Sequence, residues 1–223
     1  MALSIAMDGP VGAGKSTIAD EVARRLGILH LDTGAMYRAV GLTALKQGLD
    51  INDEEAVTRL CEHLIIDVDY GEQGQRTLVD GEDVTSCLRT EEVSMAASRV
   101  ATYSGVRRAM VAAQQRMAGE RDMLLDGRDI GTRVLPEATV KIFLTAAPEE
   151  RARRRWNQLK EKGIAADFDE VLAELRARDD QDTHRAVDPL RAAEDAVVVD
   201  TTELNFEQTV ERIVALVEEK KHG

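Results

Sequence analysis

Residues 9–16 read Gly-Pro-Val-Gly-Ala-Gly-Lys-Ser, the complete Gly-x-x-x-x-Gly-Lys-Ser/Thr pattern of a phosphate-binding loop. The apolar run Leu3–Met7 before it suits a buried strand, and residues 17–26 carry apolar side chains at helical spacing. Backbone N–H groups in the loop and the helix N-terminus would therefore converge on a polyphosphate. Lys15 would reach the β and γ phosphates, and the Ser16 hydroxyl would ligate Mg²⁺. The predicted nucleoside triphosphate site comprises Gly9, Pro10, Val11, Gly12, Ala13, Gly14, Lys15, Ser16 and Thr17.

A second group of candidate residues follows the next predicted strand, residues 28–31. The run Asp32-Thr33-Gly34-Ala35-Met36-Tyr37-Arg38 leaves the carboxyl end of that strand. Ligands of parallel α/β sheets bind beyond the carboxyl ends of strands, so Thr33 and Arg38 should face the same crevice as the phosphate loop. The alternative is a helix cap followed by a solvent-exposed arginine.

The third motif, Asp126-Gly127-Arg128-Asp129-Ile130-Gly131, ends another apolar strand. Asp126 resembles the carboxylate that holds a Mg²⁺-bound water in many phosphate-loop enzymes. Beside it, Arg128 offers a clamp for a phosphate, and Asp129 offers a hydrogen-bond acceptor for a base. The alternative is a strand-ending turn with a neutralised surface pair, but sites concentrate in loops at this edge of a sheet.

Arginines are frequent between residues 151 and 185. Arg151, Arg154 and Arg155 share one helical face, where like charges repel and a polyphosphate would relieve the repulsion. Residues 178–185 alternate in charge, which usually marks a solvated, salt-bridged helix. That interpretation suits Asp179 and Glu174. We nevertheless predict phosphate contacts for four arginines of this stretch: Arg154, Arg155, Arg178 and Arg185.

Composition limits the class of protein. The chain has 223 residues, 43% of them hydrophobic and 31% charged, which suits one α/β domain with a small appendage. Its net charge of −12 disfavours binding to nucleic acid or an anionic membrane. We find no apolar stretch near the ~20 residues of a membrane span, and no signal-peptide pattern. Cys61 and Cys87 are isolated in the sequence. We therefore expect a cytoplasmic protein with reduced thiols, and a monomer because no apolar stripe is obvious.

Strands and helices alternate along the chain. The predicted parallel strands are residues 3–7, 28–31, 123–126, 140–144 and 196–199. Residues 64–70 and 76–79, with a turn at 71–74 and another at Asp80-Gly81, predict a small antiparallel insert near residues 64–88. The predicted helices cover residues 17–26, 35–46, 54–63 (capped by Asp53), 90–119, 148–180 and 206–220. The pattern indicates a phosphate-loop NTPase fold, with a doubly wound, mainly parallel five-stranded sheet flanked by helices.

Together, the motifs resemble the bacterial cytidylate kinase family over essentially the whole chain. The segments that carry the resemblance are residues 6–17, 32–38, 89–93, 96–98, 106–107, 126–131, 141–144 and 178–185. Many families share the phosphate loop, whereas the Asp-Gly-Arg-Asp loop and the order of the motifs are more specific. The resemblance implies transfer of the γ-phosphate of ATP to CMP or dCMP with Mg²⁺. It also implies a core (about 1–32, 104–150 and 165–223), a monophosphate-binding region with the β insert (about 33–103) and a short helical lid (about 151–164) that moves on binding.

The same resemblance implies roles for single residues. Ser98, Arg107 and Asp129 would recognise cytosine, whereas Arg38, Arg128 and Arg185 would hold the α-phosphate of the acceptor. Arg178 and Asp182 would contact the sugar, with Thr33 beside the acceptor. The catalytic residues would be Lys15, Arg128, Arg154, Arg155 and Asp126. Some relatives have serine at position 33 and glycine at position 16, so Ser16 restores a direct Mg²⁺ ligand here. Arg153 is an additional lid arginine without an assigned role.

Two other functions stay open from the residues alone. The chain could phosphorylate a different small acceptor, such as another nucleoside monophosphate or a sugar-like hydroxy acid. It could also be a nucleotide-dependent switch, although it has no guanine-reading Asn-Lys-x-Asp motif and no signature for ATP-driven dimerisation. The absence of basic patches leaves nucleic-acid binding a poor third.

Overall fold

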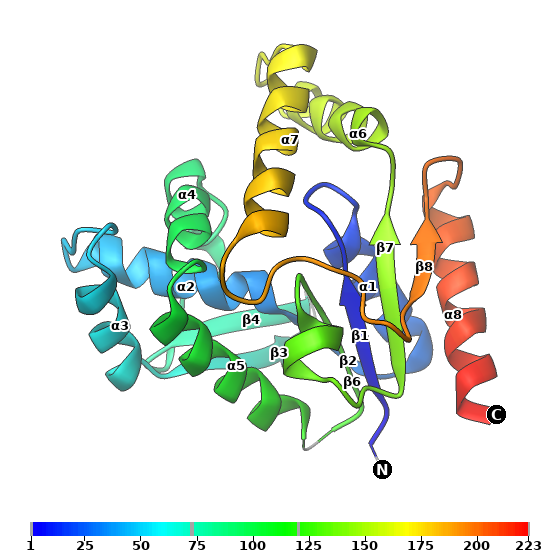
Figure 1. Ribbon diagram of the computed structural model, residues 1–223, viewed down its shortest axis with the longest axis horizontal. Helices are drawn as coiled ribbons and strands as arrows, with labels where there is room; N and C mark the ends of the chain where they lie inside the picture. The colour runs from blue at the N-terminus through cyan, green and yellow to red at the C-terminus, as the bar shows by residue number, and fades with distance from the viewer. Residues whose placement is uncertain (1, 72–73, 120, 223) are drawn as a thin grey trace.

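A five-stranded parallel sheet forms the centre of the protein (Figure 1). The computed structural model describes residues 2–71, 74–119 and 121–222. All neighbouring strands of the central sheet run parallel, as the sequence predicts, in the order β2-β6-β1-β7-β8. The strands are β1 (Ser4–Asp8), β2 (Leu29–Asp32), β6 (Met123–Gly127), β7 (Val140–Thr145) and β8 (Val197–Asp200).

Pairing in the sheet brings its acidic strand ends together. Asp32 of β2 pairs with Asp126 of β6, and Asp8 of β1 pairs with Gly127. In a parallel sheet the carboxyl ends of all strands lie at one edge, where ligands bind. Three segments far apart in the sequence therefore deliver polar side chains to one place.

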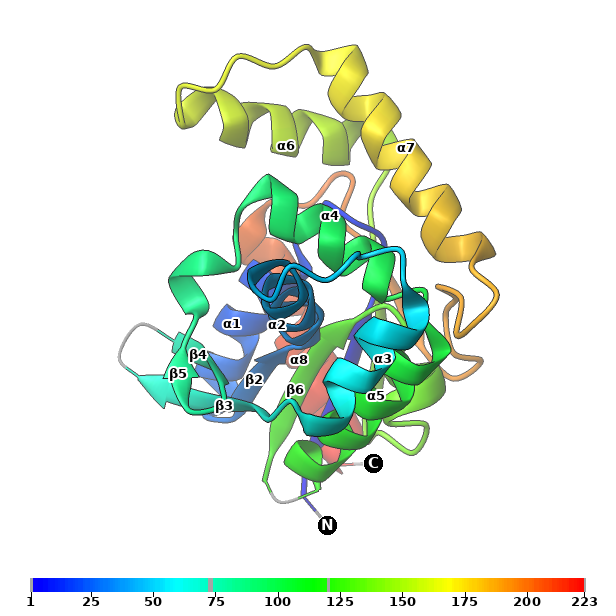
Figure 2. The same cartoon turned by 90° about the vertical axis from the view of Figure 1, so that its left-hand side faces the viewer.

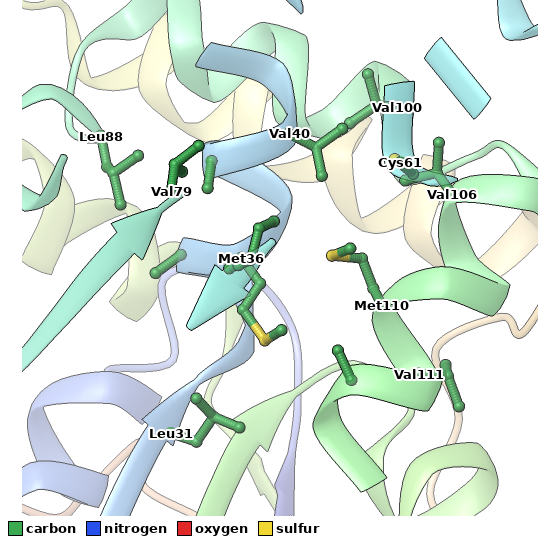
Figure 3. Packing of buried hydrophobic residues seen from close by; sticks show 14 of the residues in the cluster. Leu31, Met36, Val40, Cys61, Val79, Leu88, Val100, Val106, Met110 and Val111 are labelled. Atoms are coloured by element: carbon green, nitrogen blue, oxygen red, sulfur yellow. The ribbon is translucent and has the colours of Figure 1, made fainter. Parts of the chain in front are cut away.

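Helices cover both faces of this sheet (Figure 1). Ile5 and Met7 of β1 pack in a cluster with α1 and α8, whereas Ala6 packs in a second cluster with α2 and α5. This alternation follows from the two-residue period of a strand. Figure 3 shows the second cluster, in which Met36 lies between the strands and Met110 of α5. The helices are α1 (Lys15–Leu26), α2 (Thr33–Lys46), α3 (Glu54–His63), α4 (Glu91–Val100), α5 (Ser104–Ala118), α6 (Pro148–Glu161), α7 (Phe168–His184) and α8 (Phe206–His222).

The predicted antiparallel insert is present. It consists of β3 (Ile66–Gly71), β4 (Gly74–Val79) and the short β5 (Glu82–Asp83), followed by a 3-10 turn, Thr85–Cys87. The predicted Asp80-Gly81 turn joins β4 to β5, with φ values of 50° and 85° that suit aspartate and glycine. The other predicted turn, residues 71–74, includes residues 72–73, which lie outside the described residues.

Two of the predicted helical regions each contain two helices. Residues 90–119 form α4 and α5, separated at 101–103, where the Tyr103 hydroxyl donates to the Ile51 carbonyl at 2.7 Å. Residues 148–180 form α6 and α7, and Asp167 caps α7 by accepting from the Asp169 and Glu170 amides. The sequence predicts helical structure in both regions but not where it breaks, because the helical periodicity continues across the breaks. One π-helical turn, Ile130–Val134, was not anticipated either.

Helices α6 and α7 form a hairpin that stands out from the rest of the molecule in both views (Figures 1 and 2). They share a small cluster built on Ala152, Val171 and Leu175, separate from the two main clusters. Trp156 and Phe168 meet edge to face, with 6.5 Å between their ring centroids. Across the described residues, no helix combines the length and apolar character that crossing a membrane requires.

Candidate active site

A cavity of about 510 Å³ lies at the carboxyl edge of the central sheet. The phosphate loop, the start of α2, α4, the loop after β6 and the α6–α7 hairpin all contribute to it. Every residue predicted for substrate binding lines this cavity: Thr33, Arg38, Ser98, Arg107, Arg128, Asp129, Arg178, Asp182 and Arg185. The other predicted catalytic residues line it too: Lys15, Asp126, Arg154 and Arg155.

The phosphate loop requires glycine at its first position. Gly9 has a φ of 154°, and a Cβ there would lie 2.0 Å from the Leu144 carbonyl oxygen of β7. Gly14 adopts a left-handed conformation (φ 83°) directly before α1. Within the loop, Val11, Gly12, Gly14, Ser16 and Thr17 line the cavity beside Lys15, whereas Gly9, Pro10 and Ala13 are not among its lining residues.

Lys15 is the buried cation of the loop. Its Nζ donates to the Gly9 and Pro10 carbonyls, each at 2.8 Å. Burial, with a smaller contribution from Arg128, lowers the pKa of Lys15 to about 7. A polyphosphate in the cavity would stabilise the charged form of this amine.

A chain of hydrogen bonds joins Ser16 to the sheet edge. The Ser16 hydroxyl donates to Asp126 Oδ2 at 2.9 Å, and His30 Nε2 lies 2.7 Å from Asp126 Oδ1. The other nitrogen, Nδ1, lies 2.6 Å from Asp20 Oδ1. Burial opposes the charge of His30, but its hydrogen bonds to Asp126 and Asp20 raise its pKa to about 10.

The oxygen atoms of Ser16 and Asp126 suit Mg²⁺, which binds hard oxygen ligands. No cluster of three or more His, Cys, Asp and Glu side chains that could hold a metal occurs among the described residues. Magnesium in phosphate-loop enzymes needs no such cluster, because the substrate phosphates and water supply most of its ligands. The residues present therefore fit this ion.

In the second motif, residues 32–38, Arg38 pairs with the residue that caps α2. Asp32 caps α2 by accepting from the Ala35 amide and also accepts from Arg38 at 2.8 Å. The Thr33 hydroxyl donates to the Asp126 carbonyl at 2.7 Å, and it is buried. Gln75 of the insert accepts from the Asp32 amide at 2.9 Å, so the insert is attached to this side of the cavity.

Asp8 shapes the loop that carries Arg128 and Asp129. Its carboxylate accepts from the Ile130 amide at 2.7 Å and from the Gly131 amide at 2.8 Å. Burial raises the pKa of Asp8 to about 6, against the opposing effect of these two hydrogen bonds. The sequence analysis did not identify Asp8 as a site residue. Its place at the carboxyl end of β1 was the available signal.

Arg107, Asp129 and Arg185 form a buried charged group. Asp129 accepts a hydrogen bond from Arg107 and lies 3.5 Å from Arg185. The guanidinium of Arg107 also lies over the Tyr37 ring, 5.7 Å from its centroid. Asp188, which the sequence analysis missed, accepts from Arg107 through its side chain and from Arg185 through its backbone carbonyl.

The hairpin arginines differ in their surroundings. Arg151 is buried and paired with Asp179 at 2.6 Å, so a carboxylate of the protein relieves the predicted repulsion. Arg154 donates to the Thr201 carbonyl at 2.7 Å and to Glu150, while Arg155 is exposed at the cavity. Arg153 is exposed outside the cavity and pairs with Glu150.

The cavity concentrates positive charge on an acidic protein. Its acidic lining residues are Asp32, Asp126, Asp129, Glu174 and Asp182. Its basic lining residues are Lys15, Arg38, Arg107, Arg128, Arg154, Arg155, Arg178 and Arg185. Basic side chains outnumber acidic ones there although the whole chain carries −12, and such a field attracts a polyanion.

The fold and the site together define a phosphate-loop kinase. The phosphate loop and Lys15 line one part of the cavity, and arginines from α2, α5, the loop after β6, α6 and α7 line the rest. This arrangement provides for a polyphosphate donor and a second, anionic substrate, as phosphoryl transfer requires. A gluconokinase from Sinorhizobium meliloti 1021 shares the fold, with a TM-score of 0.51 at 13% identity over 97% of this chain and 92% of that one.

Sequence comparison identifies the particular family. The cytidylate kinase family model matches residues 5–219. The cytidylate kinase of Bacillus velezensis (strain DSM 23117) is 48% identical over 218 residues, covering 98% of this chain and 97% of that protein. That of Shouchella clausii (strain KSM-K16) is 46% identical over 216 residues, covering 97% and 96%. The chain belongs to the cytidylate kinase family, which confirms the resemblance and makes it a kinase with ATP as phosphate donor.

Proposed function

We propose that the chain transfers the γ-phosphate of ATP to CMP or dCMP, giving ADP and CDP or dCDP. The observation that carries this proposal is the shared cavity, in which the phosphate loop and the predicted acceptor residues lie together. An isolated triphosphate site would not need arginines from α2, the loop after β6 and the end of α7 beside it.

The donor phosphates would lie on the phosphate loop. Its backbone amides and the N-terminus of α1 would bind them, and Lys15 would leave the Gly9 and Pro10 carbonyls to reach the β and γ phosphates. Ser16 would hold Mg²⁺ directly and Asp126 would hold it through water. When bound, the ion neutralises charge on the β and γ phosphates.

The acceptor would be held on the opposite side by its α-phosphate. Arg38, Arg128 and Arg185 would supply bidentate contacts to the phosphate oxygens. Each arginine already has a carbonyl or carboxylate partner, which restricts its side chain. Arg178 and Asp182 on α7 would contact the sugar, and Thr33 would lie beside the acceptor.

Base recognition would rest on Ser98, Arg107 and Asp129. A carboxylate accepts a hydrogen bond from the amino group of cytosine but repels the carbonyl that uracil has at that position. Arg107 donates a hydrogen bond to Asp129, and less than 2% of the Arg107 side chain is exposed. Both groups are therefore shielded from water. This shielding makes a mismatched base costly.

The chemistry needs no strong general base. An α-phosphate oxygen of the acceptor is already anionic, and it forms a bond to the γ-phosphorus as the bond to the bridging oxygen of ADP breaks. The electron pair leaves with ADP. Lys15, Arg154 and Arg155 would stabilise the transferring group, while the acceptor arginines would align the attacking oxygen.

The lid (about 151–164) remains a prediction, and so does the division of the rest of the chain into a core and a monophosphate-binding region (about 33–103). Support comes from the separate packing of α6 and α7, whose small cluster is not part of the two main ones. Closure would exclude water from the transferring phosphoryl group.

The proposal also includes that the protein is a cytoplasmic monomer that binds no nucleic acid. The net charge and the two free cysteines support this part of it.

An acceptor panel tests the proposal. ADP formation from ATP and Mg²⁺ would be compared with CMP, dCMP, UMP, AMP, GMP and no acceptor. The proposal predicts rapid turnover with CMP and dCMP, well above UMP. Activity confined to a different acceptor would keep the phosphate loop and overturn the cytosine contacts of Ser98, Arg107 and Asp129. ATP binding without turnover on any acceptor would favour a switch.

A further inference from the structure

Arg107 is fixed by four different parts of the chain. Its Nε donates to Asp188 at 2.9 Å, its Nη2 donates to Asp129, and its Nη1 donates to the Ala101 carbonyl at 3.3 Å. The Tyr37 ring lies under the guanidinium. Among these neighbours, Asp188 is outside the lining of the cavity, so it meets Arg107 from behind the site.

Asp188 has an unusual backbone conformation. Its φ is 47°, and among the described residues only Asp80 shares a positive φ without being glycine. In this conformation, both the backbone carbonyl and the side-chain carboxylate of Asp188 accept hydrogen bonds. The carbonyl accepts from Arg185 Nε at 2.7 Å, and the carboxylate accepts from Arg107. Asp188 thereby joins the segment after α7 to α5.

The two carboxylate oxygens of Asp129 have different partners. Oδ2 accepts from Arg107, whereas Oδ1 lies 3.5 Å from Arg185. Arginine readily forms two parallel hydrogen bonds with one carboxylate. Without Asp188, the Nε of Arg107 would have no acceptor in a buried place and would turn to the second oxygen of Asp129. Asp129 would then lose the oxygen that is otherwise open to a ligand.

We propose that Asp188 is a positioning residue for base selection: it holds Arg107 so that Asp129 keeps one oxygen for the amino group of cytosine. This inference rests on the proposed function. Asp188 itself touches neither the base nor the phosphates, and it acts through Arg107.

Two variants of Asp188 separate its side chain from its backbone. Asp188→Gly removes the acceptor without backbone strain, and Asp188→Asn keeps one oxygen in a residue that tolerates this conformation. Asp80→Gly is the matched control, because Asp80 has the same backbone conformation in the turn between β4 and β5. Steady-state kinetics with CMP and UMP give kcat and KM for each variant.

The expected result is a change in selectivity. Asp188→Gly lowers the ratio of kcat/KM for CMP to that for UMP by about tenfold, mainly through KM for CMP, as loss of one charged hydrogen bond predicts. Asp188→Asn and Asp80→Gly stay closer to the wild type. In an Asp129→Asn background, Asp188→Gly has no further effect on the ratio.

Other outcomes overturn the inference. An unchanged ratio in Asp188→Gly would show that Arg107 needs no second carboxylate. An equal rise of KM for ATP and CMP, or an added loss in the Asp129→Asn background, would indicate a general structural role. A wild-type protein that does not phosphorylate CMP would contradict the proposed function itself, which distinguishes the two failures.

Discussion

Arg128 Nε donates to Asp182 Oδ2 at 2.9 Å, which joins the loop after β6 to α7. The two residues are 54 positions apart, and both line the cavity beside the phosphate loop. The pair leaves the rest of the guanidinium for another ligand, because within the described part of the chain only Nη1 has a further hydrogen-bond partner, the Gly127 carbonyl at 3.2 Å. This geometry suits an arginine that aligns an acceptor phosphate.

Replacement of Arg128 by alanine should lower kcat with CMP by about a hundredfold or more, since misaligned acceptors lose at least that much. ATP affinity should stay near the wild-type value, because Arg128 makes no hydrogen bond to the phosphate loop. Steady-state rates and calorimetric binding of ATP measure the two effects. Arg24→Ala, a change of an exposed arginine on α1, is the control. An equal loss of ATP binding would contradict the assignment.

Asp129 should govern the choice of base. Asp129→Ala should reduce the preference for CMP over UMP by about tenfold or more, because the acceptor for the cytosine amino group is lost. Asp129→Asn should reduce it too, because a neutral amide is a weaker acceptor than a carboxylate and can also donate to the uracil carbonyl. The alanine variant should also be less stable, since it leaves Arg107 and Arg185 buried with fewer partners. Competition between the two acceptors measures the preference. If the ratio does not change in the alanine variant, Asp129 does not read the base.

The Lys15 amine should take up a proton when ATP binds. Its pKa of about 7 leaves the amine mostly neutral at pH 8 and mostly protonated at pH 6, whereas bound phosphates favour the protonated form. Uptake should therefore approach about one proton at pH 8 and be small at pH 6. Calorimetry in buffers of different ionisation enthalpy measures it.

The matched variant for this titration is Lys15→Arg, which stays charged throughout and should show no such uptake. Binding heats at pH 8 that are the same in every buffer would show that Lys15 is already protonated in the free protein.

Gly105 should be required for packing of α5 on α3. A Cβ at this position would lie 2.2 Å from Thr58 Cγ2, so Gly105→Ala should lower the free energy of unfolding by about 1–3 kcal/mol. Thr58→Ala in the same chain should restore part of that loss. Gly119→Ala is the control, since the nearest atom there is 3.4 Å away. Chemical denaturation measures all three, and a fully stable Gly105→Ala variant would contradict the packing argument.

The sequence predicted those parts of the fold that depend on interactions between residues close together in the chain. The strand, glycine loop and helix around Lys15 follow from residue types within about two dozen positions, and Asp53 caps α3 as expected. The position of the break between α4 and α5 was not predicted, because Tyr103 makes its hydrogen bond with Ile51, far back in the sequence. Apolar periodicity alone gives no sign of such a contact.

Two residues of the site, Asp8 and Asp188, were missed for the same reason, because their partners lie far away in the sequence. Asp8 binds amides 122 and 123 positions later, and Asp188 binds an arginine 81 positions earlier. Arg151 shows the converse, because its crowded helical face suggested a phosphate until Asp179, 28 residues later, was found beside it. The residues predicted to touch a substrate carry motif signals, whereas those that hold them in place become visible only in the folded chain.

The most direct test follows the phosphate itself. ATP labelled at the γ-phosphate would be mixed with the protein, Mg²⁺ and equal amounts of CMP, UMP and AMP, and the labelled products separated after one turnover. The proposed function predicts label in CDP. Label that appears in inorganic phosphate or in another diphosphate instead would contradict it.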